Sequence, residues 1–491
     1  MIGEHLPIIV ILTYCLAALL MPLAGLLHRK APSMLALVAG SGALVFSLMT
    51  LWKALTEGEF SYSVGAWPPP VGIELLADPL SAFFLVVITL ISTVALFHAH
   101  FGDEAESGER SVSYYACVML MLGGFSGIIG TADLFNLFVF LELSALAGYA
   151  LLGNGSGRAA HSAFRYLILG TIGASFYLFG LGFLYAETGS LNMGDLALIL
   201  DTTGMQTTAR IAFVFIIIGI SLKMALLPLH QWLPDVYTDA PAMSTALVAP
   251  IGTKVAIYAL IRVTYDVFPA APGDWAFHLH TILAFAGAAG IIWGSVMAIP
   301  QTNLKRMLAF SSVAQIGYIA LGIGLATPFG YIGAVLHVFN HAIMKACLFL
   351  FSARLEQSGL GIRIDKLTPA TRLRLPVSTA CFVLAAISMI GLPPTAGFFS
   401  KWYLILGSYE SGNWFFIVVI LASSLLNAVY FFRIIERVYL GDTSEEAPEP
   451  VRVRLTRRNF ALVTLALSLL LAGLFNLWIV KSLIEPMVPT F

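Results

Sequence analysis

Long apolar runs separated by short polar loops dominate the chain. A transmembrane helix needs about 20 predominantly apolar residues, and runs of that kind recur along the whole sequence. The pattern predicts an all-α polytopic membrane protein with about fourteen transmembrane helices. The runs lie near residues 7–28, 33–54, 78–99, 112–129, 131–152, 162–186, 209–228, 241–267, 278–299, 304–325, 329–354, 376–408, 414–436 and 459–481.

Composition agrees with a membrane location. Hydrophobic residues make up 59% of the chain and charged residues only 11%, whereas a soluble domain carries about 25% charged residues. The net charge of −1 argues against nucleic acid as a partner. The first run has no basic segment before it and no small-residue cleavage site after it, so we expect a retained helix and no signal peptide. The cysteines lie far apart within apolar runs, which predicts buried core residues and neither a disulfide set nor a metal cluster: Cys15, Cys117, Cys347 and Cys381.

Lysine and arginine occur mainly in alternate loops, which predicts the orientation of the helices. Cytoplasmic loops carry an excess of these residues. The poorer set of loops has little beyond Lys53, Arg210 and Lys481, so we expect these loops and both termini to lie outside, in a cell (inner) membrane. The loop 101–110 is rich in acidic residues, but these contribute little to the rule. The richer set holds Arg29, Lys30, Arg110, Arg158, Lys305, Arg306, Arg354, Arg363, Lys366, Arg372, Arg374, Arg437, Arg452, Arg454, Arg457 and Arg458.

Two apolar runs are interrupted by proline in a similar way, at residues 221–230 and 391–401. Proline within a helix removes a backbone hydrogen bond and breaks or kinks it, and such backbone must face protein or water. Simple kinks are one interpretation, but each break has a lysine within about two turns, which favours a functional site. Paired breaks are typical of inverted repeats with a site near the bilayer midplane.

We therefore expect two inverted five-helix repeats, helices 4–8 and helices 9–13, in which helices 7 and 12 are broken. The expected organisation is a three-helix segment at 1–110, a first repeat at 111–267, a second repeat at 278–440, and a cytoplasmic loop with the final helix at 441–491.

Glu142 lies deep within the fifth apolar run, where a bare carboxylate is strongly unfavourable. It must pair with a cation, meet water or carry a proton. Lys223 precedes the first break and is the natural partner. The pair is either a structural ion pair or a control device, in which movement of Glu142 changes the proton affinity of Lys223 and drives proton uptake and release. Because intramembrane carboxylates are rare, we favour the second interpretation.

Basic residues also lie in the middle of two later runs. Lys254 is too far from either predicted helix end to reach the interface easily, so we predict a proton-relay residue and not a snorkelling lysine. His337, His341 and Lys345 are spaced i, i+4 and i+8 and share one helix face. An imidazole accepts a proton on one nitrogen and donates from the other, which suits proton transfer. Two histidines at this spacing can also bind a metal, but no carboxylate or cysteine lies nearby on that helix, so we expect none.

The remaining candidates flank the two breaks. Lys401 follows the second break, in the mirror position of Lys223 if the repeats hold. His230 and Asp235 lie just past the first break, where they either connect the midplane to cytoplasmic water or anchor a short interfacial helix. Asp133 lies near the outer end of the fifth helix, where capping is expected. No span shows the converging polar groups and aromatic clamps of a sugar or amino-acid site, so the row of polar residues favours the proton as cargo.

Four segments of this sequence resemble a known family. They are LFVFLELSALAGYALL around Glu142, SLKMALLPLHQWLPDVYTDAP around Lys223, HVFNHAIMKACLFLF, and GLPPTAGFFSKWYL around Lys401. In content and order they are similar to the antiporter-like subunits shared by respiratory complex I, membrane-bound hydrogenases and Mrp-type Na⁺/H⁺ antiporters. The resemblance covers about residues 110–440. It implies inverted repeats with broken seventh and twelfth helices, and a glutamate–lysine pair that feeds a central lysine and an exit lysine. Carried over, the pair is Glu142 with Lys223, the centre is Lys254 with the histidine face, and the exit is Lys401.

Within this family the glutamate in helix five, the lysine at 401 and the lack of a long amphipathic helix after the final run resemble the D subunits of bacterial Mrp antiporters. That resemblance implies a proton-translocating subunit of a multi-subunit Na⁺/H⁺ antiporter, with other membrane subunits, protons and Na⁺ as partners. A proton-pumping subunit of a redox complex is the alternative, and a scaffold protein with vestigial charges is a third. The sequence has no cysteine cluster or nucleotide-binding loop, so we expect no cofactor, and any redox centres would lie in other subunits.

Overall fold

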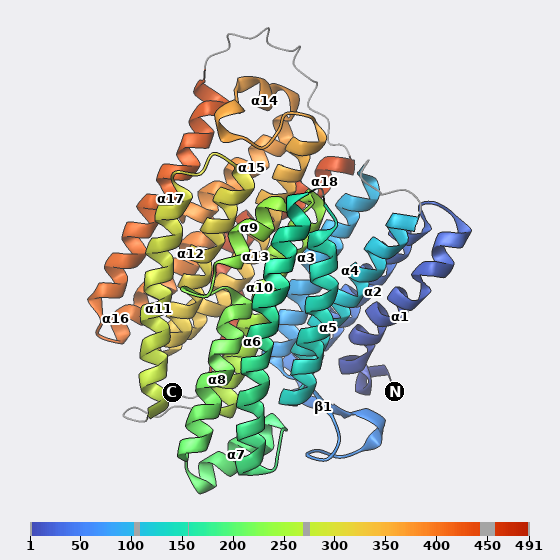
Figure 1. Ribbon diagram of the computed structural model, residues 1–491. Helices are drawn as coiled ribbons and strands as arrows, with labels where there is room; N and C mark the ends of the chain where they lie inside the picture. Colours follow the sequence, from blue (N-terminus) through green and yellow to red (C-terminus); the bar gives the residue numbers. More distant parts are fainter. Residues whose placement is uncertain (1, 103–108, 156, 269–274, 442–456, 490–491) are drawn as a thin grey trace. The chain divides into compact units, whose positions relative to one another are not determined.

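The computed structural model describes residues 2–102, 109–155, 157–268, 275–441 and 457–489. The chain is almost wholly helical (Figure 1). Among the described residues, twelve helices are long and apolar enough to cross a membrane, or up to thirteen if a bent pair, Asn459–Leu474 with Asn476–Met487, is one span. The prediction of an all-α polytopic membrane protein is confirmed. The remaining predicted span, 376–408, consists of α15 (Pro376–Ile390) and α16 (Ala396–Glu410), each too short to cross alone.

The chain divides into two compact units, which are described separately. The first unit comprises Met1–Met224 and Ile251–Phe277, and the second comprises Ala225–Pro250 and His278–Phe491. α10 (Ala242–Ile261) therefore begins in the second unit and ends in the first. The repeat boundaries expected from the sequence stay a prediction. Parts of two loops used for the predicted orientation, at 103–108 and 442–456, lie outside the described residues.

The first unit is built from long helices that approach one another at glycines. At Gly219 an added Cβ would lie 2.5 Å from the carbonyl oxygen of Gly173, so the absence of side chains lets α6 and α8 pack backbone to backbone. A short hairpin, β1 (Phe60–Ser63) with β2 (Glu74–Ala77), departs from the purely helical expectation. The helices are α1 (Leu6–Leu27), α2 (Ala31–Glu57), α3 (Pro79–Phe101), α4 (Glu109–Gly130), α5 (Leu134–Gly153), α6 (Arg158–Thr188), α7 (Met193–Thr203) and α8 (Thr207–Met224), with the π-helical turn Arg262–Val267 after α10.

In the second unit, α12 (Leu304–Gly324) and α13 (Pro328–Gln357) are almost completely buried. At Gly287 an added Cβ would lie 2.7 Å from the carbonyl oxygen of Gly317, so α11 and α12 also meet at glycines. The other helices of this unit are α9 (Trp232–Asp239), α11 (Trp275–Ala298), α14 (Pro369–Arg374), α15, α16, α17 (Trp414–Leu440), α18 (Arg457–Leu474) and α19 (Asn476–Ile479), followed by the short turns Val480–Ile484 and Glu485–Met487.

Both predicted helix breaks are present. α8 ends at Met224, Ala225 adopts a φ of 61°, and α9 begins at Trp232. α15 ends at Ile390, and Gly391 follows with a φ of 89°, a left-handed conformation that glycine adopts without steric strain.

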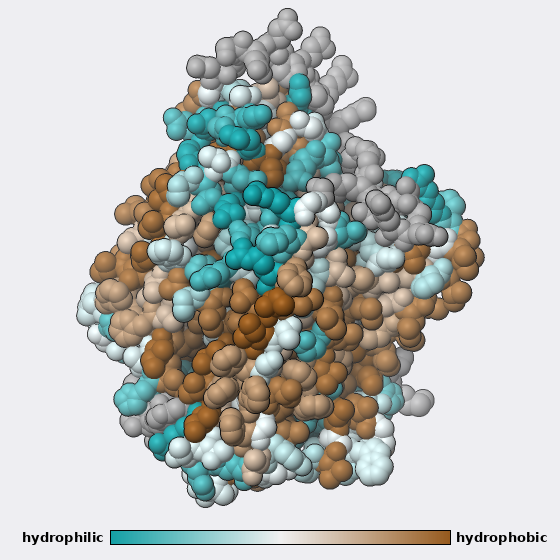
Figure 2. All heavy atoms as spheres, in the orientation of Figure 1, coloured by the Kyte–Doolittle hydropathy of each residue, from teal (hydrophilic) through white to brown (hydrophobic). Residues whose placement is uncertain are grey.

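Apolar side chains remain exposed on the outer faces of the helices. In the first unit Leu19 and Leu26 of α1 are 73% and 84% exposed, and in the second unit Leu425 of α17 is 71% exposed. Figure 2 shows that hydrophobic side chains cover much of the visible surface. Exposed apolar surface of this extent is what lipid-facing helices require.

Candidate functional site

The first unit contains the predicted ion pair between α5 and α8. Nζ of Lys223 lies 3.1 Å from Oε1 of Glu142, and the side chains are 7% and 26% exposed. Glu142 lies mid-way along α5, and Lys223 lies in the last turn of α8, directly before the break. The structure thus brings together the two charges that the sequence showed to need partners. A buried ammonium and carboxylate in contact can exchange a proton or separate their charges when the helices move.

A third residue, Tyr149, joins this pair and was not predicted from the sequence. Its hydroxyl oxygen accepts a hydrogen bond from Nζ of Lys223 at 3.4 Å. Tyr149 is buried and follows Glu142 by seven residues, which places both on one face of α5. That i, i+7 spacing was the available signal.

Lys254 lies in the part of α10 that belongs to the first unit, and its side chain is fully buried. Nζ donates a hydrogen bond to the hydroxyl of the adjacent Thr253 at 3.3 Å. A fully buried side chain does not snorkel to an interface, so the placement agrees with the predicted mid-helix position.

The second unit contains the histidine face of α13, whose members are completely buried. Nδ1 of His337 lies 2.9 Å from Oγ of Ser400, and Nε2 of the same ring lies 2.9 Å from Oε1 of Gln315. The rings of His337 and His341 stack with centroids 6.0 Å apart and an interplanar angle of 17°. Nζ of Lys345 donates to the carbonyl oxygen of Leu308 at 2.6 Å. The predicted stripe therefore exists, and each end of it has polar neighbours.

Lys401 lies in α16, directly after the second break. Nζ donates to the carbonyl oxygens of Met389 and Ile390, both at 3.0 Å, and to Oγ of Ser424 at 3.1 Å. Three acceptors satisfy the three protons of an ammonium group. Two of them are carbonyls at the C-terminal end of α15, where the helix dipole favours a cation.

Of the polar residues after the first break, Asp235 anchors a short helix. Asp235 of α9 accepts a hydrogen bond from Arg306 at 2.9 Å, which ties α9 to the start of α12. His230 is buried in the turn before α9. Asp133 caps α5, since its carboxylate accepts from the backbone N–H of Asn136 at 2.6 Å. The expectation of a cap at Asp133 is confirmed.

Two buried charged clusters were missed because their residues looked like ordinary loop or helix-end cations. In the second unit Lys305 donates to the carbonyl oxygen of Ala240 at 2.7 Å and lies 3.4 Å from Glu356. In the first unit Arg262 contacts Asp78 at 2.5 Å and Asp266 at 2.6 Å. Both cations fall inside predicted apolar runs, at 304–325 and 241–267, and that position was the signal.

Among the residues that the structure describes, no group of three or more histidines, cysteines or carboxylates is placed to hold a metal ion. Lysines and histidines buried among apolar helices, together with the carboxylate of Glu142, are typical of proton-relay sites in membrane proteins and indicate the class of antiporter-like, proton-translocating membrane subunits.

The chain belongs to the family described as NADH:quinone oxidoreductase/Mrp antiporter, TM, which matches residues 131–427. The matched segment contains Glu142, Lys223, Lys254, the histidine face and Lys401. The prediction of the family is confirmed.

Relatives of the chain belong to different kinds of assembly. It is 42% identical to the N subunit of the NADH-quinone oxidoreductase of Desulforudis audaxviator over 99% of both chains. It is 30% identical to the D subunit of the Na(+)/H(+) antiporter of Alkalihalophilus pseudofirmus over 86% of both. A chain of the membrane-bound sulfane sulfur reductase, an archaeal respiratory membrane complex, has a similar structure with a TM-score of 0.89 and 28% identity over 98% of both chains.

Proposed function

We propose that this chain carries protons across a cell membrane as one subunit of a larger complex, with both termini on the extracytoplasmic side. The observation that supports this most strongly is the partly buried contact between Glu142 and Lys223. An ion pair inside apolar helices is a poor source of stability, because desolvation offsets most of the attraction. It is a good control device, since a small separation of the charges changes how tightly the lysine holds its proton.

The route we propose has a control pair, a centre and an exit. Glu142 and Lys223 form the control pair. The central groups are Lys254 in the first unit and the face of His337, His341 and Lys345 in the second unit. Lys401 forms the exit, and His230 connects the first break to water. Each of these groups can bind or release a proton, and their buried positions limit exchange with bulk solvent to defined places.

Two sources of driving force are compatible with this route. The first is exchange of protons for Na⁺ within a multi-subunit antiporter, which the similarity to the D subunit of an antiporter supports. The second is electron transfer in neighbouring subunits, which the similarity to the N subunit of an oxidoreductase along the whole chain supports. In both cases the chain works with other membrane subunits.

Everted membrane vesicles that contain the whole complex distinguish these candidates. The host strain lacks its own cation/proton antiporters, and a fluorescent amine reports the pH difference. A pH difference that collapses on addition of Na⁺ or K⁺ supports the antiporter. One that builds only with an electron donor supports the redox complex. If the complex is assembled and neither the cations nor the electron donor change the pH difference, proton translocation is refuted.

The same vesicles test the residues. Lys223→Met and Glu142→Gln should each abolish the response, whereas Lys366→Met, a change at an exposed lysine of the second unit, should leave it intact. If both buried variants assemble and transport normally, the chain is a scaffold and its buried charges are vestigial.

A further inference from the structure

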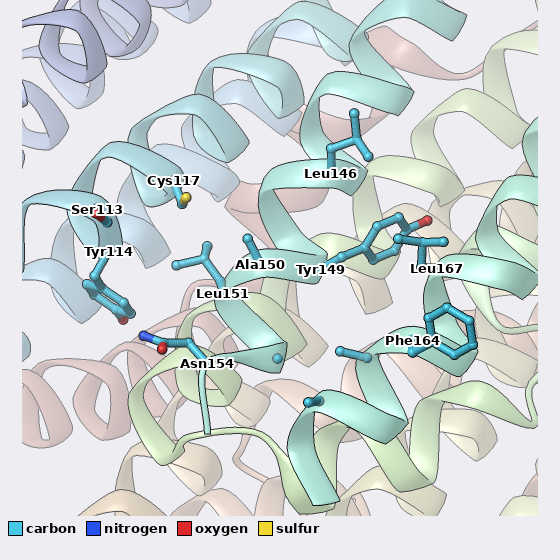
Figure 3. Close-up of a pocket in the computed structure, with 13 residues that line it drawn as sticks. Ser113, Tyr114, Cys117, Leu146, Tyr149, Ala150, Leu151, Asn154, Phe164 and Leu167 are labelled. Atoms are coloured by element: carbon cyan, nitrogen blue, oxygen red, sulfur yellow. The ribbon is translucent and has the colours of Figure 1, made fainter. Parts of the chain in front are cut away.

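A cavity of about 780 Å³ opens between α4, α5 and α6 in the first unit (Figure 3). The residues that line it include the polar Ser113, Tyr114 and Asn154 and the apolar Phe164 and Leu167. A water molecule takes up about 30 Å³ in the liquid and needs two to four polar neighbours. The cavity therefore has both the room and the polar groups to hold several waters. It lies at the C-terminal end of α5, next to a loop that the positive-inside rule places on the cytoplasmic side.

Tyr149 connects this cavity to the ion pair. Its side chain lines the cavity (Figure 3), and its hydroxyl lies 3.4 Å from Nζ of Lys223. Neither Lys223 nor Glu142 is among the residues that line the cavity. Tyr149 therefore borders both Lys223 and the cavity.

Gly170 of α6 provides the space in which the tyrosine and the lysine meet. A Cβ added at Gly170 would lie 1.9 Å from the hydroxyl oxygen of Tyr149 and 3.6 Å from Nζ of Lys223. Any side chain at this position would displace the hydroxyl. The close approach of α6 is thus a requirement of the contact between Tyr149 and Lys223, because a hydroxyl and a Cβ cannot share that volume.

We propose that Tyr149 is a proton-relay residue that connects Lys223 to water in the cavity between α4, α5 and α6. The proposal rests on the proposed function, in which Lys223 carries the proton. It adds the side from which Lys223 exchanges its proton and the group through which the exchange occurs.

The transfer is balanced without a charged tyrosine. In release, an N–H bond of the Lys223 ammonium breaks and a new O–H bond forms on Tyr149. The original O–H bond of Tyr149 breaks in the same step, and its proton joins a cavity water to give hydronium. The lysine ends as a neutral amine and the tyrosine as the neutral phenol it was before. Uptake runs through the same bonds in reverse.

Three variants in the whole complex test the relay in the vesicle assay. Tyr149→Phe keeps the ring and removes the hydroxyl, so the initial rate of proton translocation should fall at least about tenfold. Gly170→Ala should lower the rate to a similar extent, because its new methyl group displaces the hydroxyl. The double variant Tyr149→Phe/Gly170→Ser places a new hydroxyl where the old one was, beside Lys223, and should recover much of the rate.

Matched controls separate the relay from packing. Gly182→Ala lies on the same helix with nothing within 4 Å of its added Cβ. Tyr185→Phe removes the hydroxyl of an exposed tyrosine on α6, away from the cavity. Both variants should transport at the rate of the unmodified protein, with equal amounts of assembled complex.

The outcomes are distinct. A rate in Tyr149→Phe that equals the control, while Lys223→Met is inactive, overturns the relay and leaves the proposed function intact. Loss in Tyr149→Phe without recovery in the double variant assigns the tyrosine a packing role and also overturns the relay. An active Lys223→Met overturns the proposed function itself.

Discussion

The contact between Glu142 and Lys223 makes a quantitative prediction about stability and transport together. At 3.1 Å and an effective dielectric constant of about 20, the attraction is about 5 kcal/mol. Withdrawal of each ion from water costs several kcal/mol, so the intact pair contributes little net stability. Removal of one member leaves the other buried without its counter-charge, which costs about 3–5 kcal/mol. The lower figure applies to Lys223→Met, because Glu142 is 26% exposed and can still reach water.

The double variant Glu142→Gln/Lys223→Met should therefore regain most of the stability that each single variant loses. Its melting temperature in detergent should lie close to that of the unmodified complex, while each single variant melts roughly 3–5 °C lower. Transport behaves differently, since neither member of the control pair can then bind or release a proton. All three variants should be inactive in the vesicle assay.

Two results would contradict this account of the Glu142–Lys223 pair. Additive losses of melting temperature would mean that the two side chains do not interact in the protein. A double variant that regains transport along with stability would mean that the pair serves folding alone. Lys366→Met, at an exposed position, supplies the baseline for both measurements.

Three further predictions concern the other buried charges. Lys401→Met should abolish proton translocation and cost about 1–3 kcal/mol, because backbone carbonyls at the end of α15 lose their donor; vesicle transport and thermal melting measure the two effects. Burial by itself raises the pKa of Asp78, but the charge and hydrogen bonds of Arg262 outweigh burial and hold the pKa below its ordinary value. The ion pair between Asp78 and Arg262 therefore stabilises the fold at neutral pH, and this stabilisation is lost as the pH falls below about 4. In Asp78→Asn the melting temperature should depend less on pH in this acidic range. Lys305→Met should lower the melting temperature more than Arg306→Met, because the Lys305 side chain is 4% exposed and that of Arg306 is 39% exposed, where an ion pair contributes under about 1 kcal/mol.

The sequence predicted the helices because their physical signal is strong. Membrane helices must satisfy their backbone internally and expose apolar side chains to lipid, so each one is a long continuous run. The breaks were equally visible, since Pro228 and Pro394 lie inside such runs. The hairpin of β1 and β2 was missed, because its four-residue strands carry no pattern that distinguishes them from a loop.

The partners of the buried charges were harder to predict than the charges themselves. A lysine inside an apolar run needs an acceptor, but the sequence does not say whether that acceptor is a side chain or the backbone. Lys401 is satisfied by two carbonyls exposed by the helix break and one hydroxyl. Tyr149 reached Lys223 only because Gly170 leaves room for it. Such contacts depend on how helices distant in sequence approach one another, and glycine spacing alone does not fix that approach.

The two lysines beside the breaks have different hydrogen-bond partners, and this gives them different roles in the proposed route. Lys223 faces the carboxylate of Glu142, so loss of its proton leaves an unpaired negative charge in the first unit. Release at Lys223 must therefore be accompanied by movement or protonation of Glu142. Lys401 donates its three hydrogen bonds to carbonyl and hydroxyl oxygens, and its ammonium also lies over the ring of Tyr318. Loss of its proton removes one of those hydrogen bonds and leaves no buried charge behind. Proton release from Lys223 is thus controlled by the position and charge of Glu142. Proton release from Lys401 is controlled by the geometry of the break at the end of α15.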